Sequence, residues 1–552
     1  MREEKGDTMT KRDAAAAGAG LVLLTLATGQ FLMTLDSSVM NVSIAQVAED
    51  VGTTVSGIQT AITLYTLVMA TTMITGGKIG TMIGRRRAFS IGCIIYAAGS
   101  FTTAISPNLY VLLLGWSLLE GLGAALIMPA IVALVAGNFA PAARPRAYGL
   151  IASAGAIAVA VGPLLGGLVT TYFSWRWVFA GEVVLVIAIL LLARRVKDAP
   201  PPERRPKLDL FGVALSAAGL GLLVLGVLKT SEYGWIRPKE GGPAILGMSP
   251  SLWMMLAGGL VVYAFFLWEY HLQDADKEPL VDPNILKNSQ LVGGLTVFCF
   301  QFLLQAGVFF VVPLFLSVAL GLSALDTGIR LLPLSVALLV AAAGIPRLWP
   351  QANPRRIVRV GLLFVLAGIV TLVGGIDLDA GAGVVAIPML LLGLGIGSLA
   401  SQLGAVTVSA VPDEQSAEVG GLQNTFTNLG ASLGTAIAGS VLIAVLTASF
   451  LTGVTQNPDI PQSVKDQANT ELVSGIPFMS DAQLEQTMQE AGQPEETTQA
   501  AVEANRQARI DGLDSALSVL AIIAVIALFP TRRIPRRQPG AVRPPDGEGA
   551  AA

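Results

Sequence analysis

The sequence predicts an all-α, polytopic membrane protein with fourteen transmembrane helices, arranged as two six-helix bundles plus two inserted helices. Three observations predict this fold class. Of the 552 residues, 53% are hydrophobic and only 13% are charged, which is about half the charged share of a soluble domain. Apolar runs of roughly 17 to 25 residues, the length that crosses a bilayer, recur along the chain. Glycines and prolines also recur at a nearly constant offset, which indicates two related halves.

The fourteen apolar runs predict the individual helices. They start near residues 19, 55, 88, 109, 146, 177, 210, 250, 289, 327, 357, 383, 417 and 513. The repeat relates Gly121, Pro141, Gly149 and Gly162 to Gly393, Pro412, Gly421 and Gly434, respectively. It therefore pairs spans 1 to 6 with spans 9 to 14 and leaves spans 7 and 8 as the inserted pair. Parallel repeats of this kind, with a binding site at their interface, are typical of transporters.

This pattern also predicts the domain organisation. It comprises an N-terminal tail (1–18), a six-helix bundle (19–197), a linker with the inserted pair (198–288), a second bundle (289–530) and a basic tail (531–552). Within the second bundle, residues 451–512 form an external insert with two or three short helices, one of them starting with a capping box at Ser480 and Gln483. Basic residues cluster on one side of the predicted membrane, so we expect both termini to be cytoplasmic in a multi-pass protein of the bacterial inner membrane.

Several function classes are excluded by what the sequence lacks. No Walker A motif occurs, so the chain carries no ATP-driven motor. The only cysteines, Cys93 and Cys299, fall inside predicted spans, where a disulfide framework is not expected. The single histidine, His271, excludes a multi-histidine metal site. No pairing of nucleophile and base emerges, so we expect neither an enzyme nor a bound metal or cofactor.

Three acidic residues fall inside predicted spans of the first bundle: Asp36 in span 1, Glu120 in span 4 and Glu182 in span 6. A carboxylate at the centre of a span costs roughly 2.5 to 3.5 kcal/mol, so such residues usually face a cavity, a partner or a proton path. No Lys or Arg lies deep in any span, and burial without a basic partner favours the neutral carboxyl group. We therefore expect these acids to couple transport to protons and to attract cationic substrates. The alternative is a protonated carboxyl group that fixes helix packing through hydrogen bonds.

Other side chains near Asp36 are candidates for a substrate cavity. Met33 and Met40 lie within about a turn of Asp36, and pliable thioethers suit promiscuous apolar contacts. Gln30 and Asn41 could hydrogen-bond a ligand. Core filling by the methionines, and helix contacts by the amides, are the competing interpretations.

Two glycine-rich stretches predict close packing and conformational change. Residues 76–87 read GGKIGTMIGRRR, where Gly77, Gly80 and Gly84 permit a tight turn, and Arg85 and Arg86 can bond helix-terminal carbonyls. In span 5, Gly155, Gly162 and Gly166 expose a groove for a neighbouring helix, Pro163 can bend the span, and Gly167 belongs to the same conformational motif. The next segment places Trp175 and Trp177 on either side of Arg176, and we expect both rings in the aromatic belt at the membrane interface.

These stretches resemble known signatures. GGKIGTMIGRRR resembles the signature loop of the major facilitator superfamily, and residues 35–42 (LDSSVMNV) look like the first-span signature of its fourteen-span drug:proton antiporter branch. Residues 162–167 (GPLLGG) are similar to the antiporter motif, and WRWVF at 175–179 follows where that branch usually has such a segment. The resemblance implies alternating access and multidrug efflux driven by a proton gradient.

The sequence departs from the family pattern at charged positions. Thr81 and Met82 replace the usual acid and the base after it in the signature loop. In span 4, Ser117 and Glu120 stand where the resemblance implies arginine and glutamine, and Glu182 stands where the branch usually has asparagine. The arginine that family members tie to proton transfer is therefore absent, and we expect Glu120 to take over part of the proton transfer.

Together these features predict a proton-coupled antiporter that exports cationic or lipophilic compounds. An exporter of an endogenous amphiphile, such as a lipid or secondary metabolite, is the first alternative. A non-transporting membrane sensor or scaffold is the second. The expected partners are a small-molecule substrate, protons and membrane lipids, with no nucleic acid, and we expect a monomer.

Overall fold

The computed structural model describes residues 2–139, 144–196, 198, 207–238, 242–275, 277, 279–349, 351–377, 381–411, 416–458, 460–462, 465 and 478–537. Pro141 and Pro412 of the repeat, most of the external insert before residue 478 and most of the basic tail lie outside these residues, as does the side chain of Pro163.

The first bundle and the inserted pair are helical. The first bundle comprises α1 (Arg2–Val42), α2 (Ile44–Asp50), α3 (Val55–Ile83), α4 (Arg85–Ala104), α5 (Leu109–Leu112), the π-helix η1 (Leu113–Glu120), α6 (Gly121–Asn138), α7 (Arg144–Tyr172) and α8 (Arg176–Ala193). The inserted pair comprises α9 (Leu210–Leu228) and α11 (Pro250–Asp274), with the short α10 (Thr230–Tyr233) between them.

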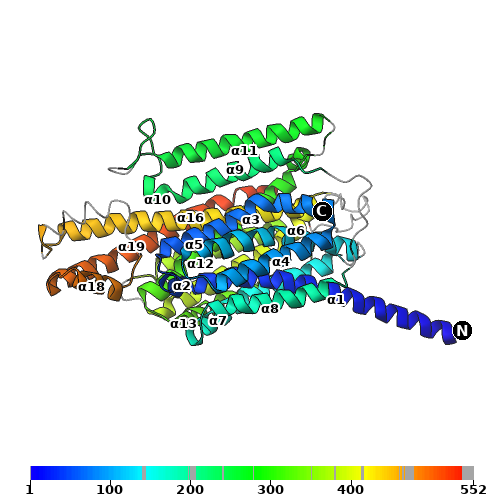
Figure 1. Cartoon of the computed structure of the whole chain (residues 1–552), viewed down its shortest axis with the longest axis horizontal. Helices are drawn as coiled ribbons and strands as arrows, with labels where there is room; N and C mark the ends of the chain where they lie inside the picture. Colours follow the sequence, from blue (N-terminus) through cyan, green and yellow to red (C-terminus); the bar gives the residue numbers. More distant parts are fainter. Residues whose placement is uncertain are drawn as a thin grey trace, which may run out of the picture.

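The second bundle follows the same plan. It comprises η3 (Pro283–Lys287), α12 (Ser289–Leu314), the π-helix η4 (Phe315–Ala319), α13 (Ala324–Leu348), α14 (Pro354–Val373), η5 (Ala382–Val385), α15 (Ala386–Val408), α16 (Ser416–Gln456), α18 (Asp481–Glu490), α19 (Glu495–Ala527) and η7 (Pro530–Arg533). Figure 1 shows the long helices running side by side, with α18 at the end opposite the start of α1. The chain is therefore an all-α membrane protein, as predicted.

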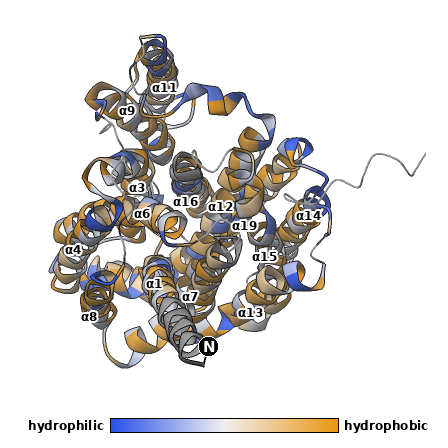
Figure 2. Ribbon diagram, turned by 90° about the vertical axis from the view of Figure 1, so that its right-hand side faces the viewer, coloured by the Kyte–Doolittle hydropathy of each residue, from blue (hydrophilic) through white to orange (hydrophobic). Residues whose placement is uncertain are grey.

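Twelve helices in the described part of the chain are long and apolar enough to cross a membrane. The other two predicted spans correspond to α4 and α7, which complete fourteen long helices. α4 opens with three arginines, which lower its mean hydropathy, and the clearly apolar part of α7 is limited to Ile157–Tyr172. Both helices nevertheless belong to the packed helices: α4, at the edge of the molecule in Figure 2, packs against α6 and α8, and α7 packs against α1 and α13.

The two bundles meet at two equivalent interfaces. α3 packs along α16, and α7 packs along α13. The sequence repeat pairs α3 with α13 and α7 with α16, so each interface is the counterpart of the other. This reciprocity is what a pseudo-two-fold relation between two bundles requires.

The repeated glycines occupy equivalent positions in the two bundles. A Cβ atom at Gly121 would meet Val68 of α3, and one at Gly393 would meet the carbonyl of Leu334 in α13. Gly162 likewise touches α1, and Gly434 touches α12. At each site only a hydrogen side chain allows the helix axes to approach so closely. The packing role predicted for Gly162 is confirmed, and the other three glycines have the same role.

The inserted pair lies at the edge of the molecule. α9 packs against α11 and also against α3 and α16, whereas α11 faces largely outward (Figures 1 and 2). The pair therefore covers the α3–α16 interface.

The described part of the external insert docks on the second bundle. Ser480 and Gln483 form the predicted capping box at the start of α18, which is confirmed. Arg509 of α19, almost fully buried, forms an ion pair with Asp481. The same guanidinium donates to the carbonyl of Met479 at 3.1 Å and to that of Val318 in η4 at 3.4 Å.

The predicted interfacial belt is wrong for one of its two tryptophans. Trp177 is 66% exposed, as expected, but Trp175 is fully buried. The Trp175 indole donates to Asp50 at 2.9 Å and lies 4.5 Å beneath the Arg176 guanidinium. Arg176 also pairs with Asp50 at 3.2 Å. The indole is drawn inward because it bridges α2 and α8.

Candidate functional site

Asp36 lies in the middle of the first bundle, fully buried on α1. Its Oδ1 accepts a hydrogen bond of 2.9 Å from the indole nitrogen of Trp116 in η1. Its Oδ2 is buried and has no hydrogen-bond partner. One oxygen of the carboxyl group is therefore held by Trp116, and the other oxygen has no hydrogen-bond partner.

Glu120 and Glu182 are held in the same way by hydroxyl groups of α4. Thr103 donates to Oε1 of Glu120 at 3.1 Å. Tyr96 and Ser100 donate to Oε2 of Glu182 at 3.2 and 3.0 Å. The second oxygen of each glutamate is buried without a partner.

The three acids, which the sequence placed in different spans, form one cluster that we call the acid trio: Asp36, Glu120 and Glu182. One carboxylate oxygen from each lies within 4.8 Å of the others, and all three residues are buried. Within the described residues, no ion pair reaches any of them.

Local backbone features bring α4 close to Glu120. The segment from Leu113 to Glu120 is a π-helix, a widened turn that is frequent at functional sites. A Cβ atom at Gly99 would lie 2.6 Å from Cγ of Glu120, and one at Gly115 would lie 2.7 Å from the backbone nitrogen of Thr103. These two glycines let the Thr103 hydroxyl reach the carboxyl group.

The partners of the acid trio were not predicted from the sequence. Tyr96, Ser100 and Thr103 are spaced i, i+4 and i+7, which places three hydroxyl groups on one face of α4. Trp116 precedes Glu120 by four residues, so both project from the same side of span 4. A search for polar residues at helical spacing opposite the acids would have found them.

A stacked pair links the acid trio to the second bundle. The ring of Tyr65 in α3 stacks on Trp116 with centroids 4.8 Å apart and planes 8° from parallel. The next residue, Thr66, accepts a hydrogen bond of 2.6 Å from Ser432 of α16. Asp36 is thus connected through Trp116 and Tyr65 to the interface between the bundles.

Of the four predicted cavity residues, the two methionines are buried, and the two amides form hydrogen bonds within α1. Met33 and Met40 are buried. The amide of Gln30 donates to Thr34 at 3.3 Å, and that of Asn41 donates to the carbonyl of Ser37 at 2.7 Å. These are contacts within α1, which agrees with the competing interpretation for the amides.

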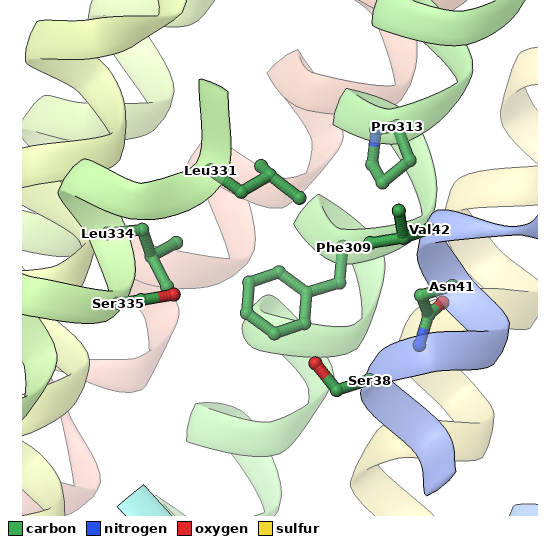
Figure 3. Close-up of a pocket in the computed structure, with 8 residues that line it drawn as sticks. All are labelled: Ser38, Asn41, Val42, Phe309, Pro313, Leu331, Leu334 and Ser335. Atoms are coloured by element: carbon green, nitrogen blue, oxygen red, sulfur yellow. The ribbon is translucent and has the colours of Figure 1, made fainter. Parts of the chain in front are cut away.

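A small pocket lies between the bundles and is lined in part by Asn41. It is formed by α1, α12 and α13 and is lined by Ser38, Asn41, Val42, Phe309, Pro313, Leu331, Leu334 and Ser335 (Figure 3). Asp36 is not among the lining residues, because its carboxyl group faces Trp116 inside the first bundle. The structure therefore separates the acid trio from this pocket.

The glycine-arginine loop makes the predicted bonds to helix-terminal carbonyls through Arg86, whereas the Arg85 guanidinium donates to the carbonyl of Ala133 within α6 at 3.0 Å. Gly84 has a φ of 102°, a conformation that side chains rarely adopt, and it separates α3 from α4. The backbone N–H groups of Arg85 and Arg86 donate to Asp198 at 3.1 and 3.3 Å, so this carboxylate caps α4. The Arg86 guanidinium donates to the carbonyls of Arg194 and Val196 at the end of α8.

The other glycines of the motifs differ in how closely they are packed. A Cβ atom at Gly77 or Gly80 would make only ordinary contacts of 3.5 and 3.6 Å, whereas one at Gly76 would lie 2.1 Å from the carbonyl of Ala125. In span 5, a Cβ atom at Gly162 would lie 2.4 Å from the Ser38 hydroxyl, and one at Gly166 would lie 3.0 Å from Val39. Gly167 is buried in the same helix.

Comparison with known proteins agrees with this architecture. The chain is 27% identical over 421 residues to the tetracenomycin C resistance and export protein of Streptomyces glaucescens, covering 76% of this chain and 75% of that protein. It is 25% identical over 457 residues to the multidrug resistance protein Stp of Mycobacterium tuberculosis (strain CDC 1551 / Oshkosh), covering 83% and 81%.

Solved structures share the fold. The crystal structure of a bacterial homolog to the human lysosomal transporter Spinster, inward-facing and unoccupied, matches with a TM-score of 0.57 at 14% identity, covering 94% of this chain and 98% of that chain. The sequence matches the family model of the Major Facilitator Superfamily over residues 26–435. Since this match spans most of the chain, the protein belongs to the Major Facilitator Superfamily.

Proposed function

We propose that this protein is a proton-coupled antiporter that exports cationic or lipophilic compounds by alternating access. The observation that carries the proposal is the buried acid trio, which has no basic partner among the described contacts. The printed names of the relatives, a tetracenomycin C export protein and a multidrug resistance protein, support export of drug-like molecules.

The geometry of the acid trio supports proton binding. Three carboxylates this close together in a low dielectric repel one another, so they cannot all be ionised. A proton bound to one of these carboxyl groups neutralises it and lowers the cost of burying oxygens that have no partner. Proton release then requires water or a competing cation to enter the cluster, which is the event that coupling needs.

The pocket between the bundles has room for only about one water molecule in this structure, but its lining has the character that suits a lipophilic substrate once the bundles move apart. Phe309, Leu331 and Leu334 give it an apolar wall, and the few polar groups on α1 and α13 can orient a ligand. Because α1 comes from one bundle and α12 and α13 from the other, relative movement of the bundles changes the shape of the pocket. The pocket and the acid trio share α1, so proton binding and substrate binding act on the same helix.

Trp116 lies in the series of contacts that connects Asp36 with the second bundle, so we expect its hydrogen bond to affect proton coupling. Replacing Trp116 by phenylalanine keeps an aromatic ring to stack on Tyr65 but removes the indole donor to Asp36. We expect efflux to persist while its pH profile shifts, because the Asp36 carboxylate loses a stabilising hydrogen bond of about 1.5 to 3 kcal/mol. Substrate-driven proton flux, measured as a function of pH in everted vesicles, checks this. An unchanged pH profile would show that the bond does not affect coupling.

The test of the proposed function is a proton-flux measurement. Everted vesicles containing the protein are energised, and a pH-sensitive dye reports proton release when monocationic, dicationic or uncharged drugs are added. We expect drug-dependent proton release with the wild type and none with the amide variants of Asp36 or Glu182. Drug efflux without proton release would disprove antiport.

Glu120→Gln separates proton coupling from recognition of substrate charge. If the Glu120 carboxylate binds the positive charge of the substrate, the variant loses dication transport selectively and keeps monocation transport. Equal loss for dications and uncharged drugs would assign Glu120 to proton coupling instead. A matched control is Glu269→Gln, which removes a buried carboxylate of α11 that accepts a hydrogen bond from the backbone of Val281.

A further inference from the structure

We propose that a groove between α14 and the end of α19 binds the headgroup of an anionic phospholipid. Arg359 and Arg532 hold the phosphate, and the acyl chains lie along the outer faces of the two helices. The site belongs to the second bundle and goes beyond the proposed function, because it neither uses the acid trio nor requires proton coupling.

The groove lies where α14 begins and α19 ends, and Figure 2 shows α14 at the outer edge of the helices. It is lined by Arg359, Leu363, Leu528, Phe529 and Arg532. Its volume is about 300 Å³, which is at the lower end of the range for ligand pockets. A phosphate headgroup fits this space, whereas the acyl chains must extend beyond it into the bilayer.

Two arginines of α14 are held in place through their Nε atoms. Nε of Arg359 donates to the hydroxyl group of Thr531 at 2.9 Å, and Nε of Arg355 donates to the carbonyl of Ile534 at 2.7 Å. Thr531 and Ile534 are fully buried, so the segment after α19 fixes both guanidinium groups. In the described part of the chain, the terminal nitrogens of Arg359 donate to no protein group. A planar guanidinium with two free N–H edges suits phosphate oxygens.

The groove carries positive charge that no acidic residue balances. The sequence contains no Asp or Glu between residues 354 and 376 or between residues 515 and 545. Among the described residues, no ion pair includes an arginine of α14 or η7. Arg355 also lies within electrostatic reach of Arg359 and Arg536. Because like charges at short range repel one another, a bound anion lowers the electrostatic energy of this cluster.

An apolar surface continues from the groove along both helices, which favours a lipid over a soluble anion. Leu363 is 50% exposed and Phe529 is 60% exposed. The Arg532 guanidinium lies 5.9 Å from the centroid of the Phe529 ring, so charge and hydrocarbon adjoin. Further exposed apolar side chains follow on the two helices: Val360, Val370, Ile522, Val525 and Ile526. A ligand that is anionic at one end and hydrocarbon at the other matches both parts.

The position relative to the membrane agrees with this ligand. The basic residues predict that the end of α19 lies on the cytoplasmic side, and basic pockets between helices on that side bind anionic headgroups. A phosphate held by Arg359 and Arg532 connects α14 with η7, which packs on α12 and α14. We therefore expect the bound lipid to stabilise this part of the second bundle.

The experiment compares phosphatidylglycerol with phosphatidylcholine on the purified full-length protein in a non-ionic detergent. Native mass spectrometry counts the lipid molecules that stay bound at each concentration. We expect one phosphatidylglycerol to bind about tenfold or more tightly than phosphatidylcholine, whose choline group cancels the phosphate charge. Equal binding of the two lipids would overturn the proposal. Displacement by glycerol 3-phosphate at the same concentration as the lipid would also overturn it, since the site would then bind a soluble anion.

A double variant and a matched control locate the site. Arg359→Gln combined with Arg532→Gln is expected to weaken phosphatidylglycerol binding by about tenfold or more. The control combines Arg194→Gln with Arg195→Gln, which removes two exposed arginines at the end of α8 on the same predicted side. We expect the control to change binding by less than about twofold. Equal weakening by both double variants would show general attraction to basic residues and disprove the site.

A single variant and the Tm guard against misfolding. Arg532 donates no side-chain hydrogen bond in the described structure, so Arg532→Gln leaves the Arg359 contact with Thr531 in place. We expect this variant to bind phosphatidylglycerol about fivefold more weakly, the usual effect of one arginine near an anionic surface. Phosphatidylglycerol is expected to raise the Tm of the wild type and of the Arg194 and Arg195 control, but not that of the double groove variant. Wild-type binding by a folded Arg532→Gln would contradict the proposal.

Discussion

Asp36→Asn is expected to abolish proton-driven efflux while the amount of protein in the membrane stays unchanged. Asparagine has the same shape as aspartate, and its carbonyl oxygen can still accept the hydrogen bond from Trp116. It cannot bind and release a proton, however, so the trio loses the member that is linked to the interface between the bundles. Drug uptake into energised everted vesicles measures the effect, and we expect the level of vesicles without the protein.

Two comparisons make the Asp36 result decisive. Glu269→Gln, which changes a buried membrane acid outside the trio, is expected to retain efflux. Downhill exchange of drug in vesicles without a gradient reports whether the variant still moves substrate. Efflux by Asp36→Asn at the wild-type rate would remove Asp36 from the mechanism.

Gly434→Ala is expected to destabilise the protein by about 1 to 3 kcal/mol, the usual range for overpacking a tight interior. A Cβ atom at this position would lie 2.1 Å from the carbonyl oxygen of Leu303 in α12, so the two helices must move apart. The backbone cannot yield as a flexible side chain would. The Tm of the purified protein in detergent measures the loss.

Gly421→Ala is the matched control in the same helix. A Cβ atom at Gly421 meets nothing within 4 Å, and alanine is favoured over glycine in a helix by about 1 kcal/mol. We expect its Tm to equal or exceed that of the wild type. Equal Tm values for the two variants would show that close approach at Gly434 does not contribute to stability.

Most of the fold could be predicted because a bilayer imposes simple rules on a sequence. A span must be long and apolar, so fourteen apolar runs were visible even where arginines interrupt the pattern at the start of α4. The repeat was visible because Gly121 and Gly393 form equivalent helix–helix contacts in the two bundles. The burial of Trp175 was not predictable from its neighbours, since its partner Asp50 lies 125 residues earlier in the chain.

The site was only partly predictable. The identity of Asp36, Glu120 and Glu182 followed from their rarity inside apolar runs. Their approach to within 4.8 Å did not, because it depends on how α1, η1 and α8 rotate about their axes. The rotation of η1 and α8 depends on their packing against α4, where Gly99 of α4 and Gly115 of η1 let these two helices approach closely. The role of each acid stays a prediction.

The repeat also shows what the two halves do not share. Glu120 directly precedes Gly121, and the residue that precedes the matching Gly393 is Leu392. The same offset relates Asp36 to Val308, and both of these counterparts are buried apolar side chains. The first bundle thus carries the carboxyl groups of Asp36 and Glu120, and the second carries apolar side chains at the matching positions. The two bundles therefore share their helix-packing contacts but not the buried carboxyl groups of the trio, so we expect an ion that binds the trio to act directly on the first bundle alone.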